Sequence, residues 1–273
     1  MNIALSLVFG AVVGLSLGLT GGGGAIFAVP LLVYGLGVPA REAVAVSLAS
    51  VGATSLVGFF HRWKLGEVEI RTGLLFAVAG MAGAPVGSWI GGLLPETVLL
   101  LLFGGLMIVV AIRLWQKASR PAPDPASRPP GAAESGPSCQ RDAEGVLILS
   151  SNCAVLLLVV GVLTGVLAGM FGVGGGFVIV PALVLFSGMS MHRAVGTSLM
   201  VIALVSASGI ASQLWAGRAI SPEITALFVA GGIAGLFAGQ RIGRRLSGPK
   251  LQKVFVVAIL AVAVFVIVRN VVS

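Results

Sequence analysis

The sequence predicts an all-α polytopic membrane protein built from two repeats of five hydrophobic segments, and three observations carry that prediction. Of the 273 residues, 57% are hydrophobic and only 10% are charged, whereas soluble domains carry about 25% charged residues. Several uncharged stretches, including 72–94 and 194–216, exceed the roughly 18 apolar residues that mark a membrane-spanning helix. The first half of the chain also recurs in the second half.

The repeat is visible when the sequence is shifted by 151 residues. Between positions 14 and 48, 14 of the 35 residues are then identical without a gap. The glycine-rich stretch GLTGGGGAIFAVP at 18–30 aligns with GMFGVGGGFVIVP at 169–181, and the two stretches end on equivalent prolines. Aligned glycine runs that each precede the same proline indicate a duplication rather than shared apolar composition.

Each half is expected to contain five segments, of which the second is too short to cross a 30 Å hydrocarbon core. We therefore expect the two short segments to be Gly-interrupted half-helices or re-entrant segments. The expected segments are 1–19, 24–36, 40–60, 71–92 and 95–115 in the first half, and 147–169, 176–187, 193–214, 221–242 and 250–269 in the second.

A proline-rich stretch separates the halves. Residues 118–145 hold six of the thirteen prolines beside serines, alanines and charges, a composition that cannot bury enough apolar surface to order itself. We expect a disordered cytoplasmic linker at 118–145 between a first transmembrane repeat at 1–117 and a second at 146–273. Cys139 and Cys153 lie near this linker and form no metal or disulfide motif, so we expect free thiols.

Basic residues predict how the halves are oriented. The loop after the third segment is basic in the first half, with Arg62, Lys64 and Arg71, whereas the loop after the fourth segment is basic in the second half, around Arg241. Equivalent loops then fall on opposite sides, which indicates an inverted repeat with both termini outside. A parallel repeat with an even number of spans per half is the alternative. The net charge of +8 follows from these loops, and no nucleic-acid partner is expected.

The paired glycine runs are the predicted functional site. Broken helix is tolerated at membrane depth only where it is buried in protein or lines a cavity, and breaks at matching places in two halves indicate a transporter's central site. Free backbone N–H groups at such breaks bind anions. Close packing of helices is the alternative role of these glycines. The candidate substrate-binding residues are Thr20, Gly21, Gly22, Gly23, Gly24, Ser47, Gly172, Gly174, Gly175, Gly176 and Ser198.

Other features narrow the chemistry. Ser47 and Ser198 are equivalent under the shift and follow the glycine runs, as candidate hydrogen-bond donors to an anion; bonding to their own helix carbonyls is the alternative. No acidic residue lies in the middle of a segment, and no metal-ligand cluster or catalytic set is evident. We expect no enzyme activity, no metal and no cofactor. Arg241 is expected to extend to the inside membrane surface, and substrate binding by Arg241 is the alternative.

The residues described so far carry a family resemblance. The two glycine runs that close on Pro30 and Pro181, each followed by Ala-Val-x-x-Ser-Leu at 43–48 and 194–199, resemble the TauE/SafE sulfite exporter family, also grouped as 4-toluene sulfonate uptake permeases. The resemblance covers both halves. It implies a secondary transporter in the bacterial inner membrane for a sulfur-containing or organic anion of the sulfite, thiosulfate, sulfoacetate or sulfonate class.

We therefore expect a small anionic substrate and the lipid bilayer as partners, with the substrate site at the interface of the repeats. A passive anion channel and a non-transporting accessory protein are the competing functions. The sequence leaves open whether protons are the coupling ion, whether the chain forms a homo-oligomer, and which anion moves in which direction.

Overall fold

The chain is a bundle of helices in a computed structural model that describes residues 3–22, 24–118, 151–172, 176–186, 189–217 and 221–243, with 260, 263 and 264. In chain order the helices are α1 (Ile3–Thr20), α2 (Ala25–Pro30), the π-helix η1 (Leu31–Gly35), α3 (Ala40–Lys64), α4 (Ile70–Leu93), α5 (Glu96–Ala118), α6 (Ser151–Phe171), α7 (Gly176–Phe186), α8 (Met191–Trp215) and α9 (Pro222–Gly243). No strand occurs within these ranges.

Six of the described helices are long and apolar enough to cross a membrane. They are α1, α3, α4, α6, α8 and α9, which confirms the polytopic all-α prediction. The short expected segments are observed as α2 with η1, and as α7. Pro30 lacks the N–H that would continue the α-helical ladder, and the π-helix follows it directly. The expected segment 250–269 and the linker 118–145 lie outside the described residues, except for 260, 263, 264 and Ala118, which ends α5.

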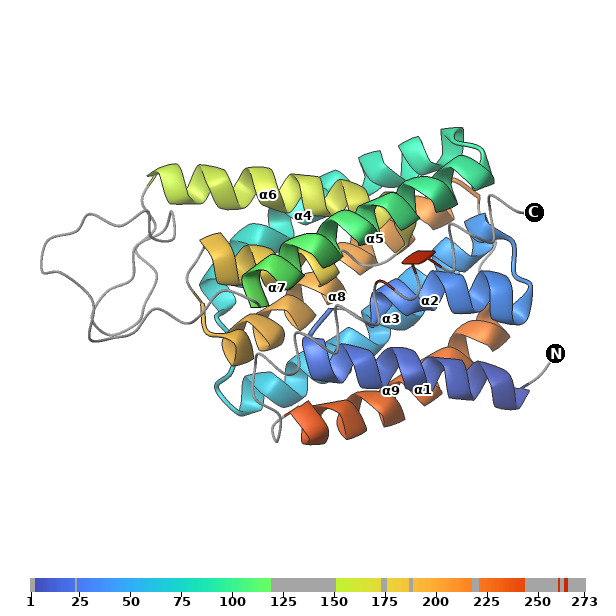
Figure 1. The fold of residues 1–273 in the computed structure, drawn as a ribbon, viewed down its shortest axis with the longest axis horizontal. Coiled ribbons are helices and arrows are strands. Elements are labelled where there is room, and N and C mark those ends of the chain that lie inside the picture. The colour runs from blue at the N-terminus through green and yellow to red at the C-terminus, as the bar shows by residue number, and fades with distance from the viewer. Residues whose placement is uncertain are drawn as a thin grey trace, which may run out of the picture.

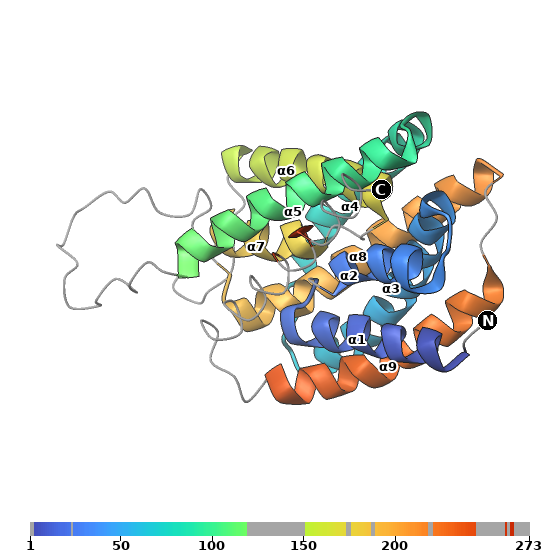
Figure 2. The same cartoon turned by 45° about the vertical axis from the view of Figure 1, so that its right-hand side comes forward.

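The closest helix pairs each combine one helix from each half of the sequence. α1 packs along α9, and α6 packs along α4; both views show these pairs side by side (Figure 1 and Figure 2). Because α6 is the repeat equivalent of α1 and α9 is that of α4, the two pairs are equivalent. The halves are therefore interlocked, and neither half contains its own closest helix pair.

Small residues line the contacts within these pairs and let the helix backbones approach closely. An ideal Cβ on Gly14 would lie 2.6 Å from the carbonyl carbon of Gly232, and one on Gly165 would lie 2.7 Å from that of Gly80. Gly10, Gly18, Gly83, Gly87, Gly161, Gly169, Gly231, Gly235 and Gly239 make the same kind of approach to a facing backbone. Any side chain at these positions would push the two helix axes apart.

The fourth segments of the two halves, α4 and α9, correspond under a sequence shift of 152 residues rather than 151. The backbone that faces Gly83 in α4 is that of Val162 and Val166, and the backbone that faces Gly235 in α9 is that of Ala11 and Leu15. Those facing residues are equivalent under the 151 shift, so Gly83 corresponds to Gly235. The reason is one extra residue in the second connection, since α3 ends at Lys64 and α4 begins at Ile70, whereas α8 ends at Trp215 and α9 begins at Pro222.

α3 and α8 cross at the centre of the bundle. In addition, α3 packs against α9, and α8 packs against α4. At the crossing an ideal Cβ on Gly52 would lie 2.8 Å from Cβ of Ser206. Ser55 and Ser206 are equivalent under the 151 shift, and both are fully buried. Their hydroxyls have no hydrogen-bond partner in the described part of the chain.

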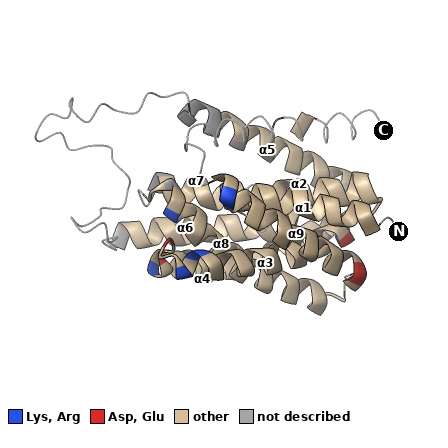
Figure 3. Ribbon diagram, turned by 90° about the horizontal axis from the view of Figure 1, so that it is seen from below, with Lys and Arg blue, Asp and Glu red and all other residues tan. Residues whose placement is uncertain are grey.

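Charged side chains lie at the ends of the bundle, and basic ones dominate one end (Figure 3). The end of α3 holds Arg62 and Lys64, the start of α4 holds Arg71, and the end of α9 holds Arg241. The ring of His61 packs edge-on against Phe237 of α9 at a centroid distance of 5.4 Å. The two connections that the sequence marks as basic therefore share one end of the molecule.

Cys153, near the start of α6, corrects one expectation. It is buried and disulfide-bonded, so the prediction of a free thiol is wrong for this residue. The other cysteine of the chain, Cys139, lies outside the described residues. The disulfide could not be predicted from the sequence, because two cysteines alone define no spacing pattern.

Candidate functional site: two linked helix breaks

Each glycine run breaks the chain at a residue with a left-handed backbone. Gly21 has a φ of 75° and Gly172 a φ of 70°, a conformation that favours glycine at the end of a helix. Gly21 N–H donates to the Leu17 carbonyl at 2.7 Å, and Gly172 N–H donates to the Ala168 carbonyl at 2.9 Å. The two breaks therefore end α1 and α6 in the same way.

Both breaks also lie directly against a helix of the opposite half. An ideal Cβ on Gly21 would lie 2.6 Å from Cα of Val195 in α8, and one on Gly172 would lie 2.6 Å from Cα of Val44 in α3. Val44 and Val195 are themselves repeat equivalents. The glycines are therefore required for space as well as for conformation.

A reciprocal pair of hydrogen bonds links the breaks to those helices. The Ser47 hydroxyl donates to the Gly172 carbonyl at 2.6 Å, and the Ser198 hydroxyl donates to the Gly21 carbonyl at 2.6 Å. Both serines are fully buried. The last carbonyls of a helix have no partner within the helix, so each serine satisfies a carbonyl that the break in the other half leaves free.

The two broken segments meet in the interior. An ideal Cβ on Gly22 would lie 2.6 Å from Cα of Gly176, the first residue of α7. Gly22, Gly24 and Gly176 are buried, as is Ala25, where α2 begins. The starts of the two short helices are thus enclosed by protein on the described residues.

The remaining candidate residues divide into two groups. The Thr20 hydroxyl donates to the Ser16 carbonyl at 2.8 Å, within its own helix, and Gly24 packs against the backbone of α1 at Val13 and Leu17. Gly23, Gly174 and Gly175 lie outside the described residues. The structure therefore brings six of the candidate residues into three contacts, Ser47–Gly172, Ser198–Gly21 and Gly22–Gly176, and three of the candidate glycines lie outside the described residues.

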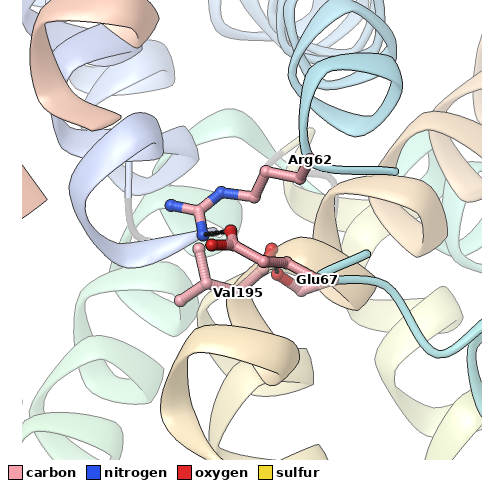
Figure 4. A network of polar contacts seen from close by, with 4 residues as sticks. Arg62, Glu67 and Val195 are labelled. Atoms are coloured by element: carbon pink, nitrogen blue, oxygen red, sulfur yellow. Dashed lines mark hydrogen bonds and ion pairs between the residues drawn. The ribbon is translucent and has the colours of Figure 1, made fainter. Parts of the chain in front are cut away.

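A charged cluster covers the first break. Arg62 is only 4% exposed, and its guanidinium lies 2.8 Å from the Glu67 carboxylate, beside Val195 (Figure 4). Val195 is the residue that contacts Gly21. The Arg193 guanidinium, near the start of α8, lies 3.6 Å from the Glu69 carboxylate. The α3–α4 connection is thereby fastened to α8 at the basic end of the bundle.

Two cavities lie beside the two breaks. One, of about 530 Å³, lies between α3 and α9 and is lined by His61, Phe237, Gln240 and Arg241. The other, of about 680 Å³, lies between α4 and α8; its lining includes Pro85, Ser88, Trp89, Ser208, Ser212 and Gln213. In transporters built from repeated halves, the substrate site lies near the bilayer midplane at the interface of the repeats.

The two cavities are repeat equivalents of each other. Every described lining residue of the α3–α9 cavity has its counterpart in the lining of the α4–α8 cavity: His61 with Ser212, Phe237 with Pro85, Gln240 with Ser88, and Arg241 with Trp89. Each cavity also adjoins a broken helix. Gly18 of α1 packs against the backbone of Gln240, and the Ser88 hydroxyl donates to the Gly169 carbonyl of α6 at 3.3 Å.

Sequence reasoning missed the cavity residues and the buried arginine. Arg62 and Gln213 are equivalent under the 151 shift and are both buried, so the shift could have identified them as a paired interior position. Gln240 pairs with Ser88 only under the offset of 152, which the shift of 151 used for the sequence comparison does not show.

Membrane-spanning helices around paired helix breaks define the class of polytopic membrane transporters, and similar proteins are named accordingly. A probable membrane transporter protein of Xylella fastidiosa (strain Temecula1) is 36% identical over 98% of this chain and 96% of its own length. The probable membrane transporter protein YunE of Bacillus subtilis is 27% identical over the same shares. A third, from Methanocaldococcus jannaschii, is 29% identical over 78% of this chain and 73% of its own.

The chain belongs to the sulfite exporter TauE/SafE family, whose model matches residues 6–266. The resemblance inferred from the glycine runs is thereby confirmed over nearly the whole chain. No solved structure matches the chain.

Proposed function

We propose that this protein is a secondary transporter that moves a small sulfur-containing or organic anion, of the sulfite, thiosulfate, sulfoacetate or sulfonate class, across the bacterial inner membrane. The observation that carries the proposal is the contact between Gly22 and Gly176, where two repeat-related helix breaks meet in the interior between two repeat-related cavities. Backbone N–H groups at such breaks suit an anion, and a family of sulfite exporters supports the substrate class.

In this proposal the substrate lies between the two glycine runs, at the interface of the repeats 1–117 and 146–273. Ser47 and Ser198 hold the broken helices in place: the Ser47 hydroxyl donates to the Gly172 carbonyl, and the one hydroxyl hydrogen of Ser198 is shared between the Gly21 carbonyl and the Val195 carbonyl of its own helix. They become donors to the anion only if those bonds open. Gly23, Gly174 and Gly175 remain proposed backbone donors at the same site.

In alternating access, two groups of helices then move relative to each other, and each group contains helices from both halves of the sequence. The α1–α9 and α4–α6 pairs are packed backbone to backbone through glycines, so each pair is expected to move as a unit. The opposite starting ends of α1 and α6 in Figure 1 support an inverted repeat. The buried contact between the two cavities favours a carrier over a continuously open channel. None of the described Asp and Glu side chains is buried, so proton coupling would use the substrate's own protonation.

The orientation rests on the basic end. Arg62, Lys64, Arg71 and Arg241 favour the cytoplasm at that end, with the linker cytoplasmic and both termini outside. The disulfide of Cys153 argues the other way, because disulfides persist in oxidising compartments. We favour the orientation that the basic residues indicate, since basic residues at several helix ends support it, whereas the disulfide is a single feature.

Transport in proteoliposomes tests the function. Wild-type protein should take up at least one of sulfite, thiosulfate, sulfoacetate and taurine with saturable kinetics, and Gly22→Ala should abolish that uptake because its Cβ would collide with Gly176. Gly105→Ala is the matched control, since nothing lies within 4 Å of its Cβ position. Ohmic single-channel currents would support a channel, and absence of all four fluxes in folded wild-type protein would refute the proposal.

A further inference from the structure

The α3–α9 cavity contains a buried amide that no structural bond explains. Gln240 is 3% exposed, and neither its side-chain oxygen nor its nitrogen has a hydrogen-bond partner in the described part of the chain. A buried amide without hydrogen-bond partners destabilises the folded protein. A side chain retained at such a cost, in the wall of a cavity, points to a partner that occupies the cavity.

The charge of the cavity identifies the kind of partner. Arg241 lies beside Gln240 in the lining, and His61 faces them from α3. The equivalent cavity has Trp89 in place of Arg241, Ser88 in place of Gln240 and Ser212 in place of His61. Its described lining residues carry no charge. The two cavities are thus related by the repeat but differ in charge: the α4–α8 cavity also has an amide, that of Gln213, whereas among the described lining residues only the α3–α9 cavity combines an amide with a cation for an oxyanion.

The position of Gln240 connects this cavity to the central site. An ideal Cβ on Gly18 would lie 2.9 Å from the backbone nitrogen of Gln240, three residues before the break at Gly21. A ligand at Gln240 therefore lies next to the end of the broken helix α1.

We propose that the α3–α9 cavity is an anion-binding vestibule, distinct from the glycine breaks, in which Gln240 and Arg241 bind a small oxyanion before it reaches Gly21. The α4–α8 cavity is its uncharged counterpart and binds the same anion more weakly. The identity of the anion as the transported substrate rests on the proposed function, whereas binding itself does not.

Equivalent cysteines make the two cavities directly comparable. In a Cys139→Ser, Cys153→Ser background, Phe237→Cys reports the α3–α9 cavity and Pro85→Cys reports the α4–α8 cavity. Each cysteine is labelled with N-ethylmaleimide, which is uncharged, in the protein reconstituted into phosphatidylcholine nanodiscs. The labelling rate is measured with sulfate as the probe anion and compared with the rate in gluconate at equal ionic strength. Sulfate at about ten times its dissociation constant should slow labelling at 237 by roughly tenfold, because only the unoccupied cavity reacts, and it should slow labelling at 85 much less.

Variants attribute the protection to named side chains. Arg241→Gln and Gln240→Leu should each remove the sulfate protection, whereas Arg71→Gln, which removes an exposed cation at the same end, should keep it. Gln240→Leu should also raise the thermal midpoint, because it deletes an unpaired buried amide. A fall in that midpoint would show that Gln240 is structural and would overturn its role as a ligand.

Three further outcomes would contradict the vestibule. They are equal labelling rates at 237 with and without sulfate, equal protection at 85, and protection that arises from anionic phosphatidylglycerol in the nanodiscs but not from sulfate, which would assign the cavity to a lipid headgroup. Sulfate protection in a protein that transports none of the four anions would retain the vestibule and refute only the transport function.

Discussion

Ser47 and Gly172 lie 125 residues apart in the chain, and the serine hydroxyl donates to the glycine carbonyl at 2.6 Å in the buried interior. The equivalent bond joins Ser198 to Gly21 at the same distance. Together they form a two-way link in which each half of the chain completes the helix break of the other. The stability of both breaks should depend on these two hydroxyls.

Loss of either hydroxyl should destabilise the protein. Ser47→Ala and Ser198→Ala each leave a buried glycine carbonyl without its donor, which costs about 1–3 kcal/mol; the cost should be the larger at Ser47, because the Ser198 hydroxyl divides its hydrogen between the Gly21 and Val195 carbonyls. Thermal unfolding of the detergent-solubilised protein measures the change. Thr225→Val, which removes a hydroxyl bond to Ser221 within one helix, should cost no more than about 0.5 kcal/mol. Alanine variants as stable as wild type would contradict the link.

Alanine at the breaks should separate backbone strain from collision. Gly21→Ala and Gly66→Ala both place a Cβ on a residue with positive φ, which costs roughly 1–2 kcal/mol. Only Gly21 has neighbours at that position, whereas nothing lies within 4 Å at Gly66. Gly21→Ala should therefore lower the unfolding midpoint far more than Gly66→Ala. Equal effects would mean that conformation alone explains the glycine.

Replacing a helix glycine with alanine should lower the stability of the protein where the glycine contacts a facing helix, and raise it where nothing faces the glycine. Gly14→Ala pushes α1 from α9, because its Cβ would overlap the backbone of Gly232, and should reduce the yield of folded protein. Gly105→Ala in α5 meets nothing within 4 Å and should stabilise its helix by up to about 1 kcal/mol. Thermal midpoints of both variants test the pair, and a tolerated Gly14→Ala would contradict the close packing.

The segments and the breaks could be predicted from the sequence, but the partners of the helices could not. Observed helix ends mostly lie within a few residues of the expected ones, because charge and glycine mark them. By contrast, the small-residue faces of α4 and α9 are chemically alike, so spacing cannot tell which of them α1 joins. The same likeness hid the offset of 152, since Gly80, Ala84, Ser88 and Gly92 match the stripe of α9 almost as well as Gly83, Gly87 and Gly91 do.

The sequence selected the residues at the two helix breaks but predicted few of their contacts, and their role in substrate binding stays a prediction. Repeat logic paired Ser47 with Ser198, yet it gave no reason for each serine to bond a glycine of the other half. That bond depends on how α3 and α8 cross, which is a property of the whole bundle. Gln240 was hidden because its counterpart is Ser88, a residue of different chemistry.

The position of Cys153 gives a test of orientation. With the basic end in the cytoplasm, the disulfide should be reduced in living cells, and a membrane-impermeant maleimide should fail to label the thiols in intact cells but label them in inverted vesicles. Mass spectrometry of protein alkylated before purification reads the redox state. A disulfide that persists in protein alkylated in intact cells would place the linker in the oxidising compartment and reverse the proposed topology.

The pairing of α1 with α9, a helix of the second half, has a consequence for biosynthesis. α1 is the first helix to leave the ribosome, and its glycine face matches a helix that is made some two hundred residues later. Until α9 arrives, that face must lie against lipid or a temporary neighbour. Assembly of the bundle is therefore completed only after translation of the second half, and a truncated chain that stops at the linker is expected to be a substrate for membrane quality-control proteases.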